Sequence, residues 1–322
     1  MPKILVTGGA GYIGSITVRH LLDRGYEVLV VDDLSRGHRH NVPHECLHVL
    51  RLQDTGAVAR LLEAGVDAVV HFAGYIAVGE STREPALYYS NNVGGTLSLL
   101  EAMARTEVRR LVFSSTAAVY GNPHQVPIPE DAPFAPVSPY GESKAVVERI
   151  LGELHRYSGL RSVALRYFNA CGAEPDKGLG EDHLPETHLI PLLLRATTTG
   201  EPIQIFGNDY PTPDGTCVRD YIHVSDLAEA HVASLEHLMA GKDSQAFNVG
   251  TGKGQTVMEV LRAVEEVTCQ MVPFALAPRR EGDAAGLVAD SSKLQHTLGW
   301  KPQCSDLNRI VRDAWEFFKA RR

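Results

Sequence analysis

Two side chains suited to acid–base chemistry stand four residues apart in the run Ser138-Pro139-Tyr140-Gly141-Glu142-Ser143-Lys144. The apolar pattern after Pro139 predicts a helix from Tyr140 to about Ser158. On that helix Tyr140 and Lys144 share one face. A cation beside a phenol favours the phenolate, which lowers the tyrosine pKa and makes it a base near neutral pH. Such a pair is also common on exposed helix surfaces, where it has no catalytic role. The other segments of the chain must therefore show whether this pair is catalytic.

A glycine-rich turn follows the first predicted strand, Lys3–Thr7. Gly8, Gly11 and Gly14 form a G-x-x-G-x-x-G pattern, and a helical run through Leu22 comes next. This strand–turn–helix context lets a pyrophosphate sit on the helix N-terminus, because glycines allow a tight turn and close backbone approach. The pattern predicts a dinucleotide-binding turn.

Asp32 ends the second predicted strand, 27–32. A carboxylate at that place accepts hydrogen bonds from a ribose diol and repels a 2′-phosphate, which favours NAD over NADP. The alternative is an ordinary turn residue.

Further strands are predicted near residues 48–52, 68–74, 111–116, 162–167, 203–207 and 246–250. Helices are predicted at 58–62, 85–105, 188–198, 225–239, 256–269 and 306–319. This alternation predicts an α/β fold: a doubly wound parallel sheet (Rossmann) with a smaller mixed α/β substrate-binding domain. We assign residues 1–168 and 219–250 to the first domain and 169–218 and 251–322 to the second. The elements at 225–250 are expected to return to the main sheet.

The composition, net charge and cysteine content of the chain argue against several classes of function. The chain has 322 residues, a net charge of −8 and a pI near 6.0, which give no support for nucleic-acid binding. We expect no membrane span and no signal peptide. Five scattered cysteines predict a reducing, cytoplasmic setting. His38, His40, His44 and His48 lack the spacing of metal ligands, so no metal site is predicted.

Several longer segments carry a resemblance that covers nearly the whole chain. They are TGGAGYIGS (7–15), HFAGYIAVGES (71–81), YYSNNVGGT (88–96), FSSTAAVYG (113–121), SPYGESK (138–144), LRYFNACGA (165–173), IFGNDYPTPDGTCVRDYIHV (205–224) and APRREGD (277–283). With these segments the chain resembles the extended short-chain dehydrogenase/reductase family, and within it the UDP-hexose 4-epimerase branch.

The resemblance implies tightly bound NAD+, reversible inversion of UDP-glucose and UDP-galactose at C4 through a 4-keto intermediate, and Tyr140, Lys144 and Thr116 as catalytic residues. Tyr140 would exchange the O4 proton, and Lys144 would hold the nicotinamide ribose and lower the tyrosine pKa. The implied cofactor-binding residues are Gly8, Gly11, Tyr12, Ile13, Gly14, Asp32, Phe72, Ala73, Gly74, Asn91, Ser114, Tyr140, Lys144 and Tyr167. The implied substrate-binding residues are Thr116, Tyr140, Asn169, His188, Leu189, Gln204, Phe206, Arg219, Arg280 and Asp283.

Some positions depart from the family pattern. Thr116 stands where serine is usual and keeps a hydroxyl on a stiffer side chain. Leu50 and Arg51 replace the Gly-Asp that contacts adenine, and Ile76 replaces a common lysine. His188 replaces an asparagine and would contact the nucleotide through backbone groups. Leu287 occupies the position that gates N-acetylhexosamines, and we expect a preference for the plain hexoses.

Rival activities on the same fold need other residues. A nucleotide-sugar 4,6-dehydratase needs an acid pair after Thr116, where this chain has Ala117 and Ala118. The same lack of an acid argues against a decarboxylase. A non-catalytic NAD sensor has no need for Tyr140, Lys144 and Thr116 together. The apolar stripes at 85–105 and 140–158 imply a homodimer through a four-helix bundle, as in the family.

Overall fold

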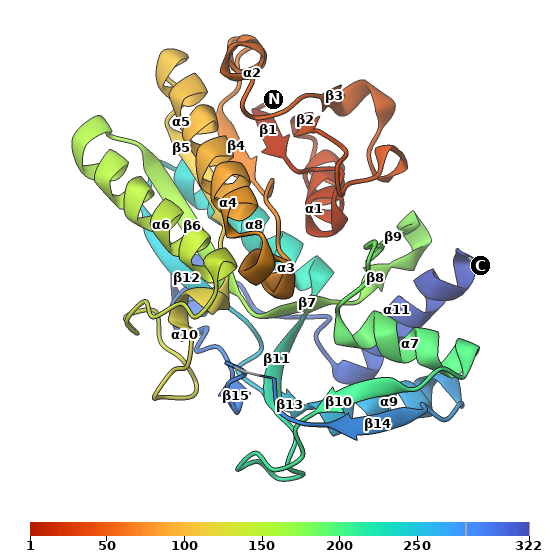
Figure 1. Ribbon diagram of the computed structural model, residues 1–322. Coiled ribbons are helices and arrows are strands. Elements are labelled where there is room, and N and C mark those ends of the chain that lie inside the picture. The colour runs from red at the N-terminus through yellow and green to blue at the C-terminus, as the bar shows by residue number, and fades with distance from the viewer. Residues whose placement is uncertain (281, 322) are drawn as a thin grey trace.

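The computed structural model describes residues 1–280 and 282–321 (Figure 1). A seven-stranded sheet has the order β12-β6-β5-β4-β1-β2-β3, and every neighbouring pair in it is parallel. Its strands are β1 (Lys3–Thr7), β2 (Glu27–Asp32), β3 (Leu47–Val49), β4 (Ala68–His71), β5 (Arg110–Ser114), β6 (Arg161–Tyr167) and β12 (Gln245–Val249). The predicted doubly wound fold is therefore confirmed.

Helices cover both faces of this sheet (Figure 1). On one face α1 and α8 enclose a core that includes Leu21, Leu227 and Leu235. On the other face α2, α5 and α6 enclose a second core around Leu99, Met103 and Leu151. The bounds are α1 (Tyr12–Asp23), α2 (Thr55–Leu62), α5 (Gly95–Arg105), α6 (Pro139–Ser158) and α8 (Val224–Met239). The strands read as continuous apolar runs because both faces are buried.

The remaining elements form a smaller mixed α/β part. Strand β11 (Val218–His223) pairs with β7 (Asn169–Cys171), β13 (Gly254–Thr256) and β15 (Gly286–Leu287). The other elements here are β8 (Ala173–Glu174), β9 (Leu179–Gly180), α7 (Leu189–Thr199), β10 (Ile203–Phe206), α9 (Val257–Thr268), β14 (Phe274–Ala277) and α11 (Leu307–Ala320). As predicted, β12 returns to the main sheet, beside β6. The exact division into two domains stays a prediction.

The predicted single helix 85–105 is interrupted. It consists of α4 (Pro85–Tyr88), a π-helical segment (Tyr89–Gly94) and α5. The side chain of Asn92 lies in the π segment, donates to Tyr75 O and Ser143 Oγ at 3.0 Å each, and accepts from Tyr75 N at 2.8 Å. These tertiary bonds hold the helix in a widened turn, a form that often marks functional sites. Two short helices, α3 (Val78–Arg83) and α10 (Ser292–Leu298), were not predicted.

Within the part of the chain that the structure describes, no helix has both the length and the apolar composition that crossing a bilayer requires.

Candidate active site

The glycine-rich turn lies between β1 and α1, at the carboxyl edge of the sheet. Gly8 has a φ of +70°, and a Cβ there would stand 2.5 Å from Ala73 N. A Cβ on Gly14 would stand 2.3 Å from Gly8 O. Only glycine therefore allows the turn to close against β4 and α1 to close against the turn. The N-cap of α1 is Gly11, which has no side chain to occupy the helix N-terminus. This open end fits a pyrophosphate.

Asp32 lies at the end of β2, buried against that turn. Its Oδ2 accepts from Ala10 N at 3.0 Å and its Oδ1 from Leu34 N at 2.8 Å. Burial raises the pKa of Asp32, and the two backbone donors oppose that shift. A carboxylate has about four acceptor positions, so capacity remains for a ribose diol.

Tyr140 and Lys144 both lie in the first two turns of α6. Ser138 caps this helix by accepting from Gly141 N at 3.1 Å, and Pro139 occupies its first turn. Both side chains are buried, with Tyr140 7% and Lys144 4% exposed. The helix was therefore predicted correctly, and the pair is not decoration of an exposed surface.

Thr116 adds a third side chain, and a second hydroxyl group, to the pair. It follows β5, accepts from Ala118 N at 3.2 Å and hydrogen-bonds the Tyr140 phenol. Burial raises the pKa of Tyr140, and the Thr116 bond lowers it. The expected lowering by Lys144 is not what the protein alone produces, because desolvation of the phenol outweighs every other influence on its pKa.

Lys144 is held away from water by the end of β5. Its Nζ donates to Ser114 O at 2.9 Å and lies 4.9 Å from the centre of the Phe113 ring. Burial lowers the pKa of Lys144 to about 8, although the carboxylate of Glu148 opposes the shift. A Cβ on Gly74 would stand 3.5 Å from that Nζ, so the turn after β4 passes directly over the amine.

Among the other predicted cofactor residues, Ser114 and Tyr167 lie next to this pair, and the rest contact other segments. Ser114 Oγ and Tyr167 OH are 2.7 Å apart, and Tyr167 is close enough to Tyr140 that a phenolate there raises its pKa. Asn91 Nδ2 donates to Asn92 Oδ1 at 3.2 Å. The Phe72 ring packs on His231, and Ile13 packs on the core beneath α1. Tyr12 OH donates to Gly172 O at 2.6 Å.

Strand β11 aligns several of the predicted substrate residues. Asn169 of β7 lies opposite Tyr221, and Arg219 lies opposite Leu287 of β15. Arg219 Nη2 is 3.3 Å from Asp283 Oδ1, and its Nη1 donates to Ala284 O at 2.9 Å.

The remaining predicted substrate residues lie on neighbouring segments. Arg280 lies 3.9 Å over the ring of Phe206 in β10. Leu189 begins α7, and His188 is the N-cap of that helix. The side chain of Gln204 is exposed on β10, and that of His188 turns toward Glu181. Asn169 and Arg219 therefore lie on the adjacent strands β7 and β11, whereas Gln204 and Phe206 lie on β10, which pairs with β14 in a separate sheet.

One supporting group was missed by sequence reasoning. Glu148 is buried one turn after Lys144, accepts from Ser115 Oγ and forms a 2.7 Å ion pair with Arg166 Nη2. It anchors the segment that carries Thr116. The sequence indicates this role only through spacing, because Glu148 follows Lys144 by four residues and so shares its face of the predicted helix.

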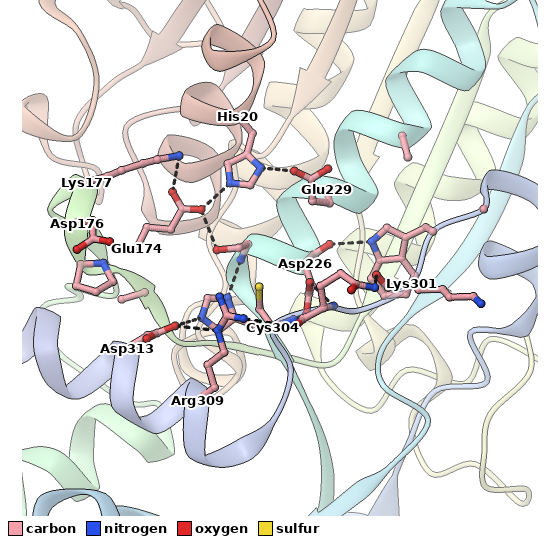
Figure 2. Close-up of a pocket in the computed structure, with 18 residues that line it drawn as sticks. His20, Glu174, Asp176, Lys177, Asp226, Glu229, Lys301, Cys304, Arg309 and Asp313 are labelled. Carbon is pink, nitrogen blue, oxygen red and sulfur yellow. Dashed lines mark hydrogen bonds and ion pairs between the residues drawn. The ribbon is translucent and has the colours of Figure 1, made fainter.

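A further cleft lies elsewhere. It measures about 840 Å³ and is lined by residues of α1, α8, α11 and the loop after α10. Figure 2 shows His20 between Glu174 and Glu229 on its wall. None of the predicted site residues lines it.

The chain was compared with family models, with curated proteins and with solved structures. Residues 4–250 match the model of the NAD dependent epimerase/dehydratase family. UDP-glucose 4-epimerase of Lacticaseibacillus casei is 47% identical over 317 residues, which cover 98% of this chain and 96% of that protein.

Two solved structures have the same fold as this chain. The crystal structure of UDP-glucose 4-epimerase from Brucella ovis in complex with NAD has a TM-score of 0.96 and 44% identity, covering 99% of this chain and 98% of that one. The crystal structure of UDP-glucose 4-epimerase from Stenotrophomonas maltophila, with bound NAD and formylated UDP-arabinopyranose, has a TM-score of 0.96 and 40% identity. It covers 100% of this chain and 99% of that one.

Proposed function

The chain belongs to the NAD dependent epimerase/dehydratase family, and we propose that it catalyses the reversible C4 epimerisation of UDP-glucose and UDP-galactose with bound NAD. The observation that carries this proposal is the buried set of Tyr140, Thr116 and Lys144 beside the glycine-rich turn. It provides one group to move a proton and one cation beside the cofactor position.

The residues divide the work of the reaction. NAD, when bound, accepts a hydride from C4 and returns it to the opposite face of the 4-keto sugar. Tyr140 takes the proton from O4 during oxidation and gives it back during reduction. Thr116 holds O4 and donates to Tyr140, which favours the phenolate. Lys144 supplies a charge beside the phenol and the ribose.

The positive charge of bound NAD would lower the pKa of Tyr140, an effect that Lys144 alone does not produce in the protein. In the protein, burial raises the pKa of Tyr140. A cationic ring close to the phenol would oppose that effect, since an opposite charge favours the ionised form. We therefore infer that base strength at Tyr140 depends on the oxidised cofactor.

Asn169, Phe206, Arg219, Arg280 and Asp283 would hold the uridine diphosphate, together with His188, Leu189 and Gln204. Burial raises the pKa of the Cys217 thiol, and the positive charges of Arg219 and Arg280 both oppose that rise. Both guanidinium groups therefore act on the surroundings of the same thiol. Ala117 and Ala118 offer no acid for dehydration, which favours epimerisation over the 4,6-dehydratase reaction.

A homodimer and a cytoplasmic location are also proposed. Leu87, Tyr89 and Leu97 are between 38% and 47% exposed along the α4–α5 segment, which packs beside α6. A four-helix contact between two copies would cover them. Light scattering should give the mass of two chains, and Leu97→Glu should shift it to one; a wild-type chain of single mass would contradict the proposal.

The assay that tests the activity needs only one substrate. Purified protein is incubated with UDP-galactose without added NAD, and UDP-glucose is measured. Conversion is expected, because the cofactor is held tightly. No conversion with or without added NAD would overturn the proposed epimerase, and formation of a 4-keto-6-deoxy product would favour the dehydratase.

A further inference from the structure

The segment between β9 and α7 gathers four side chains of metal-ligating type. Glu181, His183, Glu186 and His188 each place one ligand atom within 4.8 Å of the others. They occupy positions i, i+2, i+5 and i+7 of one short stretch. Sequence analysis predicted no metal site and weighed only the histidines at 38–48; the four residues here come together only through the path of the loop.

The contacts in this cluster are close, but they lack the geometry of hydrogen bonds. His188 Nδ1 and His183 Nδ1 both approach Glu181 Oε1, the second at 3.3 Å. Glu186 lies 3.5 Å from His188 Nδ1 and 4.0 Å from His183 Nδ1. Glu181 Oε1, His183 Nδ1 and His188 Nδ1 are all buried without a hydrogen-bond partner. These three buried atoms meet at one point and contact only one another, an arrangement that a shared ligand would satisfy better.

Two of the side chains are already oriented for ligation. The Glu181 side chain is only 6% exposed and points into the cluster. Glu186 Oε1 accepts from the backbone nitrogens of Thr187 and His188 at 2.7 and 2.8 Å. Those bonds fix the carboxylate and leave Oε2 toward His183, as supporting bonds do around metal ligands.

We propose that Glu181, His183, Glu186 and His188 bind one divalent transition-metal ion, with Zn²⁺ as the best match. Two imidazole nitrogens and two carboxylate oxygens suit zinc, whereas Mg²⁺ and Ca²⁺ take oxygen ligands. Tetrahedral zinc with bonds of roughly 2.1 Å separates its ligand atoms by roughly 3.4 Å. The 3.3 Å between His183 Nδ1 and Glu181 Oε1 is close to that separation, whereas His188 Nδ1 would move away from Glu181, and Glu186 Oε2 toward His183, when the ion binds.

The alternative is a pair of imidazolium–carboxylate ion pairs. In such pairs each N–H would point at its own carboxylate oxygen with good hydrogen-bond geometry. Here both Nδ1 atoms converge on the same oxygen of Glu181, so that two imidazoles share one carboxylate oxygen. A shared central ion satisfies all of them at once.

The position of the site gives the ion a structural role. His188 is the N-cap of α7, and the ring of His183 lies 6.3 Å from that of Tyr12, the first residue of α1. The ion therefore ties the beginning of α7 to the glycine-rich turn. If the proposed function holds, it also fixes the backbone of His188 and Leu189, which we assign to the nucleotide.

Metal binding is tested on the full chain, prepared without a polyhistidine tag and stripped with a chelator. Zn²⁺ is titrated in competition with a chromophoric chelator, and Co²⁺ is added separately to record visible absorption. We expect one tight Zn²⁺ per chain, a raised thermal midpoint with Zn²⁺, and the absorption bands of four-coordinate Co²⁺. Mg²⁺ and Ca²⁺ at equal concentration should leave the midpoint unchanged; an equal shift would overturn the assignment to a transition metal.

Variants show whether these residues are the ligands. Glu186→Gln retains an oxygen for the two backbone donors and loses the ligating oxygen, so it should weaken Zn²⁺ binding at least tenfold while the chain stays folded. His183→Asn should abolish the Co²⁺ bands. His44→Gln removes an exposed histidine and should change neither. Equal binding by wild type and Glu186→Gln, or an equal loss in His44→Gln, would overturn the site. No substrate is needed, so failure here is distinct from failure of the epimerase assay.

Discussion

Leu287 lies directly opposite Arg219 in the parallel pairing of β15 with β11. The register places a residue proposed to hold the diphosphate beside one expected to limit the size of the sugar. Leu287 also packs against the cluster that includes Ala117 and Val119, just after Thr116. One strand pair therefore connects the residue proposed to bind the nucleotide with the segment that carries the proposed catalytic residue Thr116.

Enlarging that position should narrow the substrate range. Leu287→Tyr adds volume where the acetamido group of UDP-N-acetylglucosamine would lie, so kcat/KM for that substrate should fall at least tenfold relative to UDP-glucose. The measurement is the ratio of the two kcat/KM values. Leu276→Tyr, at an exposed leucine of β14, should leave the ratio unchanged. An unaltered ratio in Leu287→Tyr would remove this residue from the site.

Tyr140→Phe should keep NAD and lose turnover. The hydroxyl is the only group proposed to move the O4 proton, so kcat should fall by roughly 10³-fold, in the range for loss of a general acid–base group. Bound NAD is measured by absorbance after denaturation, alongside the rate with UDP-galactose. Tyr157→Phe serves as the control, since Tyr157 is 76% exposed on the same helix. A rate near wild type in Tyr140→Phe would refute the assignment of the base.

The contribution of the Thr116 hydroxyl to turnover can be separated from that of the side chain's shape. Thr116→Val is nearly isosteric but loses the bond to Tyr140, so kcat should fall roughly 10²-fold, as for removal of one positioned donor. Thr116→Ser keeps the hydroxyl and should stay within a few fold of wild type. If the two variants were equally active, Thr116 would have no part in proton transfer.

Stability should depend on pH through His20. Glu174 and Glu229 accept bonds from its two ring nitrogens at 2.6 and 2.7 Å, and the pKa of His20 is raised to about 9 despite burial (Figure 2). The unfolded pKa is about 6.5. Because the folded pKa is the higher one, this stabilisation is complete below about pH 6.5 and is lost as pH rises through about 9.

The size of that effect is on the order of 1–2 kcal/mol, discounted because Glu229 is partly exposed. The free energy of unfolding by urea is compared between wild type and His20→Gln from pH 6 to 9.5. The difference should be largest at pH 6 and shrink toward pH 9.5. A difference independent of pH would show that His20 acts by packing alone.

Local sequence patterns predicted the elements whose form is set by nearby residues. Gly8, Gly14 and Asp32 lie where the strand–turn–helix pattern placed them, since sterics at a tight turn leave few alternatives. The helix after Pro139 also has the expected bounds, because its cap and apolar period are written in adjacent residues.

Contacts between distant segments escaped prediction. The π-helical segment depends on Asn92 bonding Tyr75 and Ser143, and the pKa of Tyr140 depends on how deeply the phenol is buried. The cluster at 181–188 depends on the path of a loop. None of these can be derived from periodicity, because each is decided by tertiary packing.

The place of β12 in the main sheet has a consequence for synthesis of the chain. Its partner β6 is complete at residue 167, but β12 begins only at residue 245. While the intervening segment is being made, β6 presents an apolar strand with an unpaired edge. Because unpaired apolar edges favour pairing with other chains, we expect the nascent protein to be prone to aggregation until β12 docks.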